Sequence, residues 1–311
     1  MRTRNDRMTD AVLICPGQGA QRPGGLADLA DLPTGFRTPF TLASEIVNCD
    51  LWRLGQSAEA EDVAALRQPS LLQPYLIAWA ATEFQAAQDR IGDRIVYVTG
   101  HSSGLNSAIA LSGATSLEAA LRFAHECGRS MDRDCAEHPG GLLALVGASR
   151  ATAEAIAGDC GAVLANHNAP DQTVLGGSSE ALARATTQAP EQGAQAVALR
   201  VAGAFHTPAF LTSDSANQAL IDQLDVAREF TPIIGNRSGQ VIESAEQLRA
   251  ELRSQYVRPV EWFDVLETLH DRGVRRFLTL GPGNVMAGLV RRYAKSRPER
   301  ITITRLSQLM H

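Results

Sequence analysis

The chain has 311 residues with ordinary proportions of apolar and charged residues, enough to bury the core of one large domain or of one domain with an insertion. Its net charge of −5 is mild and argues against a general nucleic-acid-binding protein. No apolar run is long enough for a membrane span or a signal peptide, and five cysteines without a CxxC pair predict reduced thiols in a cytoplasmic protein.

The first half of the chain contains two predicted buried strands, each followed by a glycine-rich turn. Residues 11–15, AVLIC, end at PGQGAQRPGG, and residues 94–100, RIVYVTG, end at GHSSG. A helix is predicted between them over residues 69–90, and helical spacing resumes after the second turn up to Gly113. The next helix begins after Ser116, a favourable N-cap residue. Strands that run into tight turns and then helices indicate an α/β fold.

The middle of the chain has a different order of elements: strand, helix, two strands, helix and strand. This βαββαβ order is that of the ferredoxin-like split unit. We therefore predict a small ferredoxin-like subdomain at residues 139–201, inserted into an α/β body made of residues 1–138 and 202–311. The later predicted elements are a strand at TPIIG, helices near residues 245–254 and 262–272, a strand at RRFLTL and a helix after GPGN.

The turn GHSSG fits the G-x-S-x-G nucleophile elbow, with Ser102 at the nucleophile position. Such a tight turn leaves no room for side chains at the flanking Gly100 and Gly104. A frame centred on Ser103 fails, because it would place His101 at a glycine position. Ser102 is therefore the candidate nucleophile, and the backbone N–H of Ser103 is a candidate oxyanion donor. A chance glycine–serine turn is the alternative.

A serine nucleophile needs a base. Among the seven histidines, His206 stands out because the segment GAFHTP joins the inserted unit to the main body, where a loop can return to the elbow. Single histidines are, however, more often surface or core residues. No metal-ligand spacing such as HxxxH or HExxH occurs, so no metal site is predicted.

Five motifs occur in a characteristic order: PGQGAQ, GHSSG, AFHTP, QYVRPVEW and GPGNVMAGLVRR. In these motifs the chain resembles malonyl-CoA:acyl carrier protein transacylases and the acyltransferase domains of polyketide synthases, over nearly its whole length. The resemblance implies an α/β-hydrolase-like body with a ferredoxin-like subdomain over the cleft. It also implies ping-pong acyl transfer, an acyl carrier protein as partner, and a thioester substrate on CoA or a carrier. No further cofactor is implied, because the substrates themselves carry CoA or phosphopantetheine.

The resemblance assigns roles by position. Ser102 is the nucleophile and His206 the general base of a Ser–His dyad. The backbone N–H groups of Gln18 and Ser103 form the oxyanion hole. The stretch around Gln255 supplies the main-chain carbonyl that orients His206, in place of a triad carboxylate.

The sequence departs from the family at the expected acyl pocket. Malonyl-selective members carry an arginine on the helix after the elbow, which pairs with the free carboxylate of the acyl group. Cys127 stands at that position. Arg129 lies about 200° further round the helix, and Arg122 is also out of register. Breaking such a buried pair costs on the order of 3–5 kcal/mol, so we expect an acyl group without a free carboxylate.

Two observations keep the malonyl alternative open. Phe205 and His101 are expected to line the substrate pocket, and the AFH motif resembles the version found in malonyl-type domains. Cys127 could also be plain helix packing, with another arginine reaching the pocket from elsewhere.

The last helix carries a local excess of basic residues that we expect to dock an acidic carrier protein, although a solvated helix end is the alternative. These residues are Arg291, Arg292, Lys295, Arg297 and Arg300.

The predicted function is a discrete acyltransferase for a fatty, branched, aminoacyl or peptidyl group in polyketide-type, antibiotic biosynthesis. An editing acyl hydrolase needs the same dyad, and a malonyl-CoA:carrier transacylase is a further alternative. A catalytically inactive docking protein is disfavoured by the intact Ser102 and His206.

Overall fold

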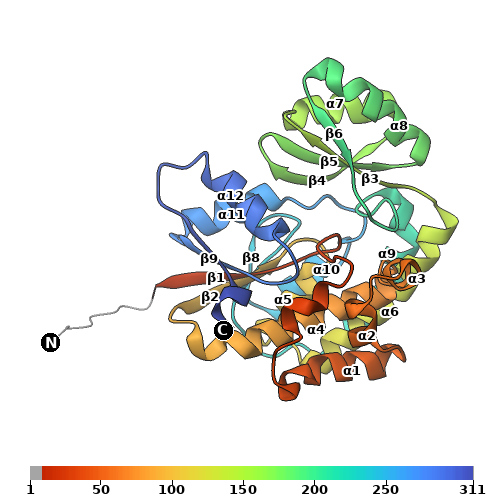
Figure 1. Ribbon diagram of the computed structural model, residues 1–311. Helices are drawn as coiled ribbons and strands as arrows, with labels where there is room; N and C mark the ends of the chain where they lie inside the picture. Colours follow the sequence, from red (N-terminus) through yellow and green to blue (C-terminus); the bar gives the residue numbers. More distant parts are fainter. Residues whose placement is uncertain (1–8, 311) are drawn as a thin grey trace.

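The computed structural model describes residues 9–310, and its larger part is built on a six-stranded sheet (Figure 1). The strand order is β10-β9-β1-β2-β7-β8, and every neighbouring pair is parallel except β7 and β8. The strands are β1 (Asp10–Cys15), β2 (Arg94–Gly100), β7 (Ile233–Ile234), β8 (Val241–Ile242), β9 (Arg276–Thr279) and β10 (Thr302–Arg305).

Strand β1 lies inside this sheet and is buried on both faces. Its odd-numbered residues, such as Leu13, pack with α4 (Pro69–Ala87), α5 (Gly104–Leu111) and α6 (Leu117–Glu137). Its even-numbered residues pack with α11 (Trp262–Asp271) and α12 (Val285–Ala294) on the opposite face. This is the period-two alternation of a strand covered by helices on both sides, which explains why AVLIC is an unbroken apolar run.

Four helices of the body were not predicted from the sequence, because each buries few side chains. Helix α3 buries none of its residues, and α1 buries three. The strands β8 and β10 were missed as well, being only two and four residues long. The remaining helices of the body are α1 (Thr38–Val47), α2 (Leu51–Gln56), α3 (Ala60–Ala65), α9 (Leu211–Gln223) and α10 (Ala245–Leu252).

The second sheet has four antiparallel strands in the order β4-β5-β3-β6, with α7 and α8 on one face (Figure 1). This arrangement confirms the predicted ferredoxin-like subdomain. On β3, Leu143 and Leu145 pack among the helices, whereas Leu142 and Ala144 face the body. The elements are β3 (Gly141–Val146), α7 (Arg150–Cys160), β4 (Val163–Ala169), β5 (Gln172–Gly177), α8 (Ser179–Gln188) and β6 (Gln195–Ala198).

The small subdomain is bonded to the body along β4. The N–H of His167 donates to the carbonyl of Val260 (2.8 Å), and the N–H of Val260 donates to the carbonyl of Ala165 (2.9 Å). Arg150 pairs bidentately with Glu261, at 2.8 and 3.1 Å. These bonds hold the small subdomain in place above the large sheet. The exact boundaries of the small subdomain remain a prediction.

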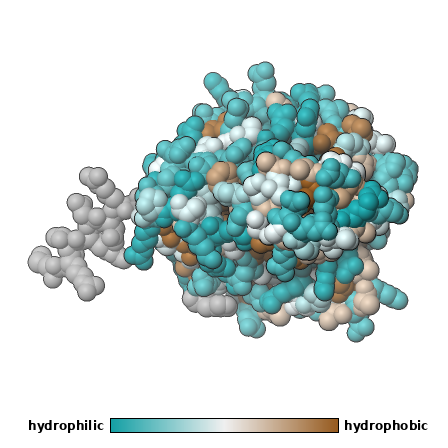
Figure 2. Space-filling model, turned by 90° about the horizontal axis from the view of Figure 1, so that it is seen from above, coloured by the Kyte–Doolittle hydropathy of each residue, from teal (hydrophilic) through white to brown (hydrophobic). Residues whose placement is uncertain are grey.

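The face seen in Figure 2 is mainly hydrophilic, with small hydrophobic groups scattered among polar residues. Within residues 9–310, no helix combines the length and apolarity needed to cross a membrane. All five cysteines lie in this range and are free thiols.

Candidate active site

The nucleophile elbow has the tight geometry that its glycines suggest. Strand β2 ends at Gly100, α5 begins at Gly104, and Ser102 between them has a φ of 54°. A Cβ atom on Gly100 would lie 2.1 Å from the carbonyl oxygen of Gly104, and one on Gly104 would lie 2.6 Å from that of Cys15. Side chains therefore cannot replace either glycine, and the turn leaves the Ser102 side chain at the cleft.

His206 reaches Ser102 from the loop that follows the small subdomain. Its Nε2 lies 2.6 Å from Ser102 Oγ. Its Nδ1–H donates to two main-chain carbonyls, those of Gln255 (3.0 Å) and Arg258 (3.1 Å). With Nδ1 protonated in this way, Nε2 is free to accept the serine proton. The structure thus brings the three predicted residues together, and it adds the carbonyl of Arg258 as a second acceptor that was not predicted from the sequence.

The imidazole of His206 is neutral over the physiological pH range. Burial lowers the pKa of His206 to about 4, and the neighbouring His101 lowers it further, whereas the bonds to the carbonyls of Gln255 and Arg258 act in the opposite direction. A neutral imidazole that is already oriented by its Nδ1–H is in the form that a general base requires.

The predicted oxyanion donors lie at the elbow, but one of them is occupied. The N–H of Gln18 donates to the side-chain Oγ of Ser103 at 3.1 Å. Gly17 precedes it and cannot carry a side chain, because a Cβ would lie 2.2 Å from the carbonyl oxygen of His101. The Ser103 hydroxyl therefore competes with any oxyanion for the N–H of Gln18.

Asn236 also holds the elbow, although it was not predicted from the sequence. Its Oδ1 accepts from the N–H of Ser102 (3.2 Å), and its Nδ2 donates to the carbonyl of the same residue (3.0 Å). Both backbone groups of the strained residue are thereby satisfied. A strand was predicted at TPIIG, directly before this asparagine, but only the fold shows that Asn236 lies beside Ser102.

A very small pocket of about 10 Å³ lies behind Ser102. Its lining includes Met131, Phe205 and Tyr256, together with Gln73, which donates to Met131 Sδ and accepts from Asn106 Nδ2. No arginine or lysine lines this pocket among the residues that the structure describes. The volume is near the lower limit for one water molecule, so an acyl chain enters only if these side chains move.

The prediction that Cys127 lines the pocket needs correction. Cys127 is fully buried behind the lining, beside Tyr256, a residue that does line the pocket. Met131, one turn further along α6, lines the pocket in place of Cys127. Burial raises the pKa of the Cys127 thiol to about 12, so that this position supplies no charge.

The two other arginines considered on α6 point elsewhere. Arg122 pairs with Glu118 at 2.8 Å, and Arg129 pairs with Glu126 at 3.4 Å, both on the exposed face of the helix. Neither lines the cleft or the pocket behind Ser102. The helix register therefore excludes both from the acyl site, as the sequence predicted.

A larger cleft of about 220 Å³ opens between the two subdomains and includes Ser102 and His206. Phe205 and His101 line it, as expected. His101 also joins the subdomains, because its Nε2–H donates to Asn168 Oδ1 on β4 at 2.8 Å. Much of the lining is apolar, and Arg200 is the one cationic residue of the described chain that lines the cleft.

The basic residues of the C-terminal region differ in their surroundings. Arg292 pairs with Asp171 at 2.6 Å, and Arg297 forms an ion pair with Glu267. Arg291 and Lys295 are exposed and line a shallow groove on α12. Arg300 is also exposed, beyond the end of that helix. Only part of the predicted docking surface is thus available to a partner's carboxylates.

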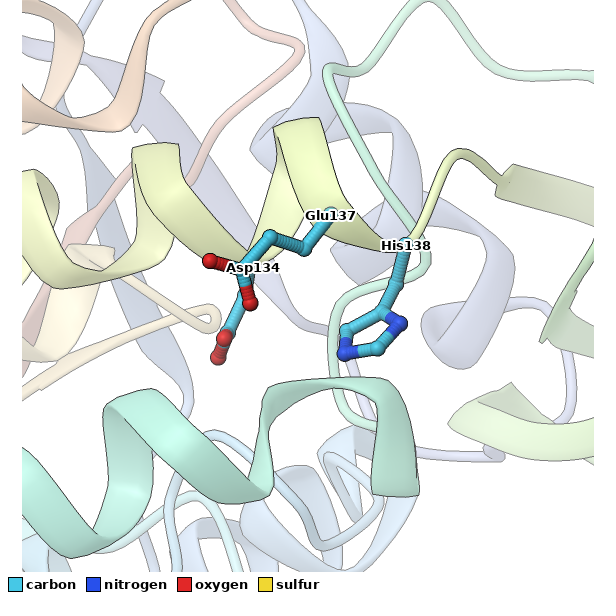
Figure 3. A group of neighbouring side chains, drawn as sticks. All are labelled: Asp134, Glu137 and His138. Carbon is cyan, nitrogen blue, oxygen red and sulfur yellow. The ribbon is translucent and has the colours of Figure 1, made fainter.

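A group of three potential metal ligands, Asp134, Glu137 and His138, lies at the end of α6 (Figure 3). Asp134 is buried, and its Oδ2 accepts hydrogen bonds from the N–H (2.9 Å) and the Oγ (2.5 Å) of Ser213 on α9. Glu137 and His138 are exposed. The group lies apart from the residues that line the cleft, and Asp134 ties α6 to α9.

The fold and site together define a class of enzyme. A serine on a strand–turn–helix elbow, a neutral histidine at hydrogen-bond distance and backbone donors beside them form the machinery of acyl transfer through a covalent acyl-serine.

Comparison with known proteins specifies this class. The profile of the family described as acyl transferase domain matches residues 12–296. A malonyl CoA-acyl carrier protein transacylase of Mycobacterium tuberculosis is 29% identical over 290 residues, which cover 93% of this chain and 94% of that protein. The polyketide biosynthesis protein ThaF of Burkholderia thailandensis is 33% identical over 284 residues, 90% of this chain but only 24% of that protein.

Solved structures agree with the sequence relatives. The malonyl CoA-acyl carrier protein transacylase of Coxiella burnetii superposes with a TM-score of 0.88 at 29% identity, covering 97% of this chain and 96% of that chain. A malonyl-transacylase in complex with a type II polyketide synthase acyl-carrier protein gives a TM-score of 0.87 at 26% identity, covering 97% of both chains. The chain belongs to the acyl transferase domain family and is an acyltransferase.

Proposed function

We propose that the protein transfers an acyl group without a free carboxylate between a thioester donor and an acyl carrier protein, through an acyl-Ser102 intermediate. The names of its relatives, and the relative solved with an acyl-carrier protein, support a carrier as partner. Its likeness to part of a polyketide biosynthesis protein supports a place in polyketide-type biosynthesis.

The geometry suits a two-step reaction. Ser102 Oγ gives its proton to His206 Nε2 and attacks the thioester carbonyl, forming a tetrahedral oxyanion. The N–H of Ser103 stabilises this charge, and so does the N–H of Gln18 once it leaves Ser103 Oγ. The C–S bond then breaks, and the departing thiolate takes the proton from His206.

The second step is the reverse reaction with a new thiol. The carrier's phosphopantetheine thiol gives its proton to His206 Nε2 and attacks the acyl-Ser102 carbonyl. Collapse of the second oxyanion breaks the C–O bond, and Ser102 recovers its proton from His206. Because the same groups act in both directions, the donor is either CoA or a carrier thioester.

The absence of a cation from the described lining of the small pocket carries the proposed specificity. A carboxylate buried there would lose its water without gaining a partner, which costs several kcal/mol. The names of the relatives favour a malonyl group instead. A malonyl specificity requires Arg200 of the cleft to pair with the malonyl carboxylate. The pocket's small volume also disfavours a long fatty chain unless Met131, Phe205 or Tyr256 moves.

Transfer to a carrier is tested by mass spectrometry of both products. The protein is loaded with an uncharged acyl group and mixed with a carrier protein bearing phosphopantetheine. The proposal predicts that the carrier gains the acyl mass as acyl-Ser102 is lost, and that Ser102→Ala abolishes the gain. Release of free acid at the same rate with and without carrier would identify a hydrolase and contradict the proposal.

A further inference from the structure

A second pocket, of about 110 Å³, lies beside the cleft and is lined by three arginines: Arg22, Arg67 and Arg200. It is formed by the PGQGAQ loop, the segment around Ser57 and the turn after α3. No aspartate or glutamate lines it among the described residues. Three arginines and no carboxylate along the described lining make the potential of this cavity positive.

The arginines differ in how far they are neutralised. Arg22 pairs with Asp28 at 2.7 Å. Arg67 and Arg200 are exposed, and neither forms an ion pair with a carboxylate of residues 9–310. The nearby Asp62 is occupied by Arg53, with two bonds of 2.9 and 3.0 Å. Arg67 and Arg200 are therefore available to bind an anionic ligand in the pocket.

The pocket adjoins the cleft that contains Ser102. Arg200 and Gly19 line both the pocket and the cleft that contains Ser102. Gly19 has a φ of 93°, and its N–H donates to Gln21 Oε1 at 2.8 Å, which sets the course of the loop between the two cavities. A substrate arm that runs along the cleft away from Ser102 therefore reaches Arg200 at the rim.

We propose that this pocket binds the phosphate of the phosphopantetheine arm that brings the acyl group to Ser102. Guanidinium groups match phosphate oxygens with paired, charge-assisted hydrogen bonds. The inference rests on the proposed function, because that function supplies a substrate with a phosphate at the far end of a flexible arm. Arg67 anchors the phosphate in the pocket, and Arg200 binds it from the cleft side.

Three donors with one uncharged acyl group test the proposal: acyl-pantetheine, acyl-phosphopantetheine and acyl-CoA. The second-order rate of Ser102 acylation is measured for each by intact-protein mass spectrometry. We expect the wild type to prefer acyl-phosphopantetheine over acyl-pantetheine by about tenfold or more, the usual worth of charge-assisted hydrogen bonds. Arg67→Gln should bring this ratio toward one, and Arg200→Gln should lower it as well.

The control is Arg122→Gln, which removes an exposed arginine that lines neither cavity and should keep the ratio. A wild-type ratio near one, or a ratio unaffected by Arg67→Gln, overturns the proposal. If acyl-CoA reacts faster than acyl-phosphopantetheine and Arg67→Gln removes only that extra advantage, the pocket binds a nucleotide phosphate of CoA, and the assigned ligand is wrong. Equal rates for these two donors support the phosphopantetheine phosphate.

Binding measured without catalysis separates this proposal from the proposed function. Phosphopantetheine and pantetheine are titrated by calorimetry into Ser102→Ala protein, with and without Arg67→Gln. Tighter binding of phosphopantetheine that depends on Arg67 supports the pocket even if no acyl transfer is found. Normal acyl transfer with no such dependence overturns the pocket and leaves the proposed function intact.

Discussion

Ser102 and His206 are both held in an uncommon backbone conformation, with φ values of 54° and 63°. Each such residue costs of order 1–3 kcal/mol, so its surroundings have to fix it. Asn236 bonds both backbone groups of Ser102, and two carbonyls hold the ring of His206. Strain at both members of one hydrogen-bonded pair is the residue-scale reason to regard the pair as functional.

The pH dependence of acylation follows from the lowered pKa of His206. The base must be neutral, so the rate with a phosphate-free thioester should stay constant from pH 8 to about 5 and halve near pH 4. Since the unfolded chain binds this proton below about pH 6.5 and the folded chain does not, His206 also lowers stability as pH falls between 6.5 and 4. Intact-protein mass spectrometry of quenched reactions measures the rate.

Glu83 provides the control for this profile. Burial raises the pKa of Glu83 to about 7, and its Oε2 accepts from the N–H of Gly281 at 2.6 Å. A change in acylation rate near pH 7 that disappears in Glu83→Gln is caused by titration of the Glu83 carboxyl. A half-maximal rate near pH 6.5 that persists in Glu83→Gln would mean that His206 has an ordinary pKa, and would contradict the effect of burial on this histidine.

Ser103→Ala tests the bond between its hydroxyl and the N–H of Gln18. The substitution keeps the Ser103 backbone donor and frees the donor of Gln18, so acylation should be unchanged or a few-fold faster. Ser102→Ala is the matched variant and should give no acyl-enzyme. A loss of a hundredfold in Ser103→Ala would show that the hydroxyl itself serves the oxyanion. An adduct that survives in Ser102→Ala but not in Ser103→Ala would reverse the choice of nucleophile.

At the scale of elements, three glycine turns pack against one another around Ser102. Gly17 lies against the carbonyl of His101 in the elbow, and Gly281 has a φ of 94° and lies against Pro16. A Cβ on Gly281 would approach Pro16 Cγ to 2.2 Å. The turns PGQGAQ, GHSSG and GPGN thus form one packed unit, which accounts for the presence of all three motifs in the sequence.

Gly17→Ala should disturb catalysis more than a loop substitution elsewhere. The new methyl group forces the turn away from His101 and displaces the N–H of Gln18, so we expect a loss of about 10²–10³ in acylation rate. Stability should fall by roughly 1–3 kcal/mol through overpacking. Thermal unfolding and acylation are measured together, with Gly35→Ala as control because nothing lies within 4 Å of its added Cβ. Equal behaviour of the two variants would contradict the packed unit.

The long, periodic or strongly apolar elements could be predicted from the sequence, and so could the tight turn that carries Ser102. Strand β2 has the predicted limits, and the four-stranded sheet has the predicted order of elements. Helix α6 begins directly after Ser116, as predicted, and runs to Glu137. Asn236 and Tyr256 could not be assigned, since their contacts with Ser102 and Cys127 arise only when distant segments meet.

At the scale of the whole molecule, hydrogen bonds and ion pairs hold the small subdomain in place over the cleft. Bonds from β4 to Val260, from Arg150 to Glu261 and from His101 to Asn168 all join the small subdomain to the body. Arg292 adds a fourth contact through Asp171, next to the predicted docking surface. A carrier protein that binds beside α12 therefore meets residues that also hold the two subdomains together.

Carrier docking is tested with the basic residues that are free of such contacts. Charge reversal at Arg291 and Lys295 should raise KM for an acyl-carrier donor several-fold relative to a minimal thioester, and should weaken its salt dependence. Arg292→Glu is the contrast, because it also breaks the pair with Asp171 and should affect both substrates. Equal losses of the Arg291 and Lys295 variant with both donors would point to structural damage and contradict docking at this surface.

A competition between donors at Ser102 tests the proposed acyl specificity most directly. Wild-type protein is mixed with equal concentrations of malonyl and uncharged acyl thioesters. The reaction is quenched within one turnover, and the adducts on the protein are identified by intact-protein mass spectrometry. Because no arginine or lysine lines the described pocket and the buried Cys127 thiol carries no charge, uncharged adducts should predominate by at least about tenfold. Cys127→Arg with Tyr256→Leu, which adds a guanidinium and makes room for it, should shift the ratio toward malonyl. A wild-type protein that carries mainly malonyl on Ser102 would contradict the proposed specificity.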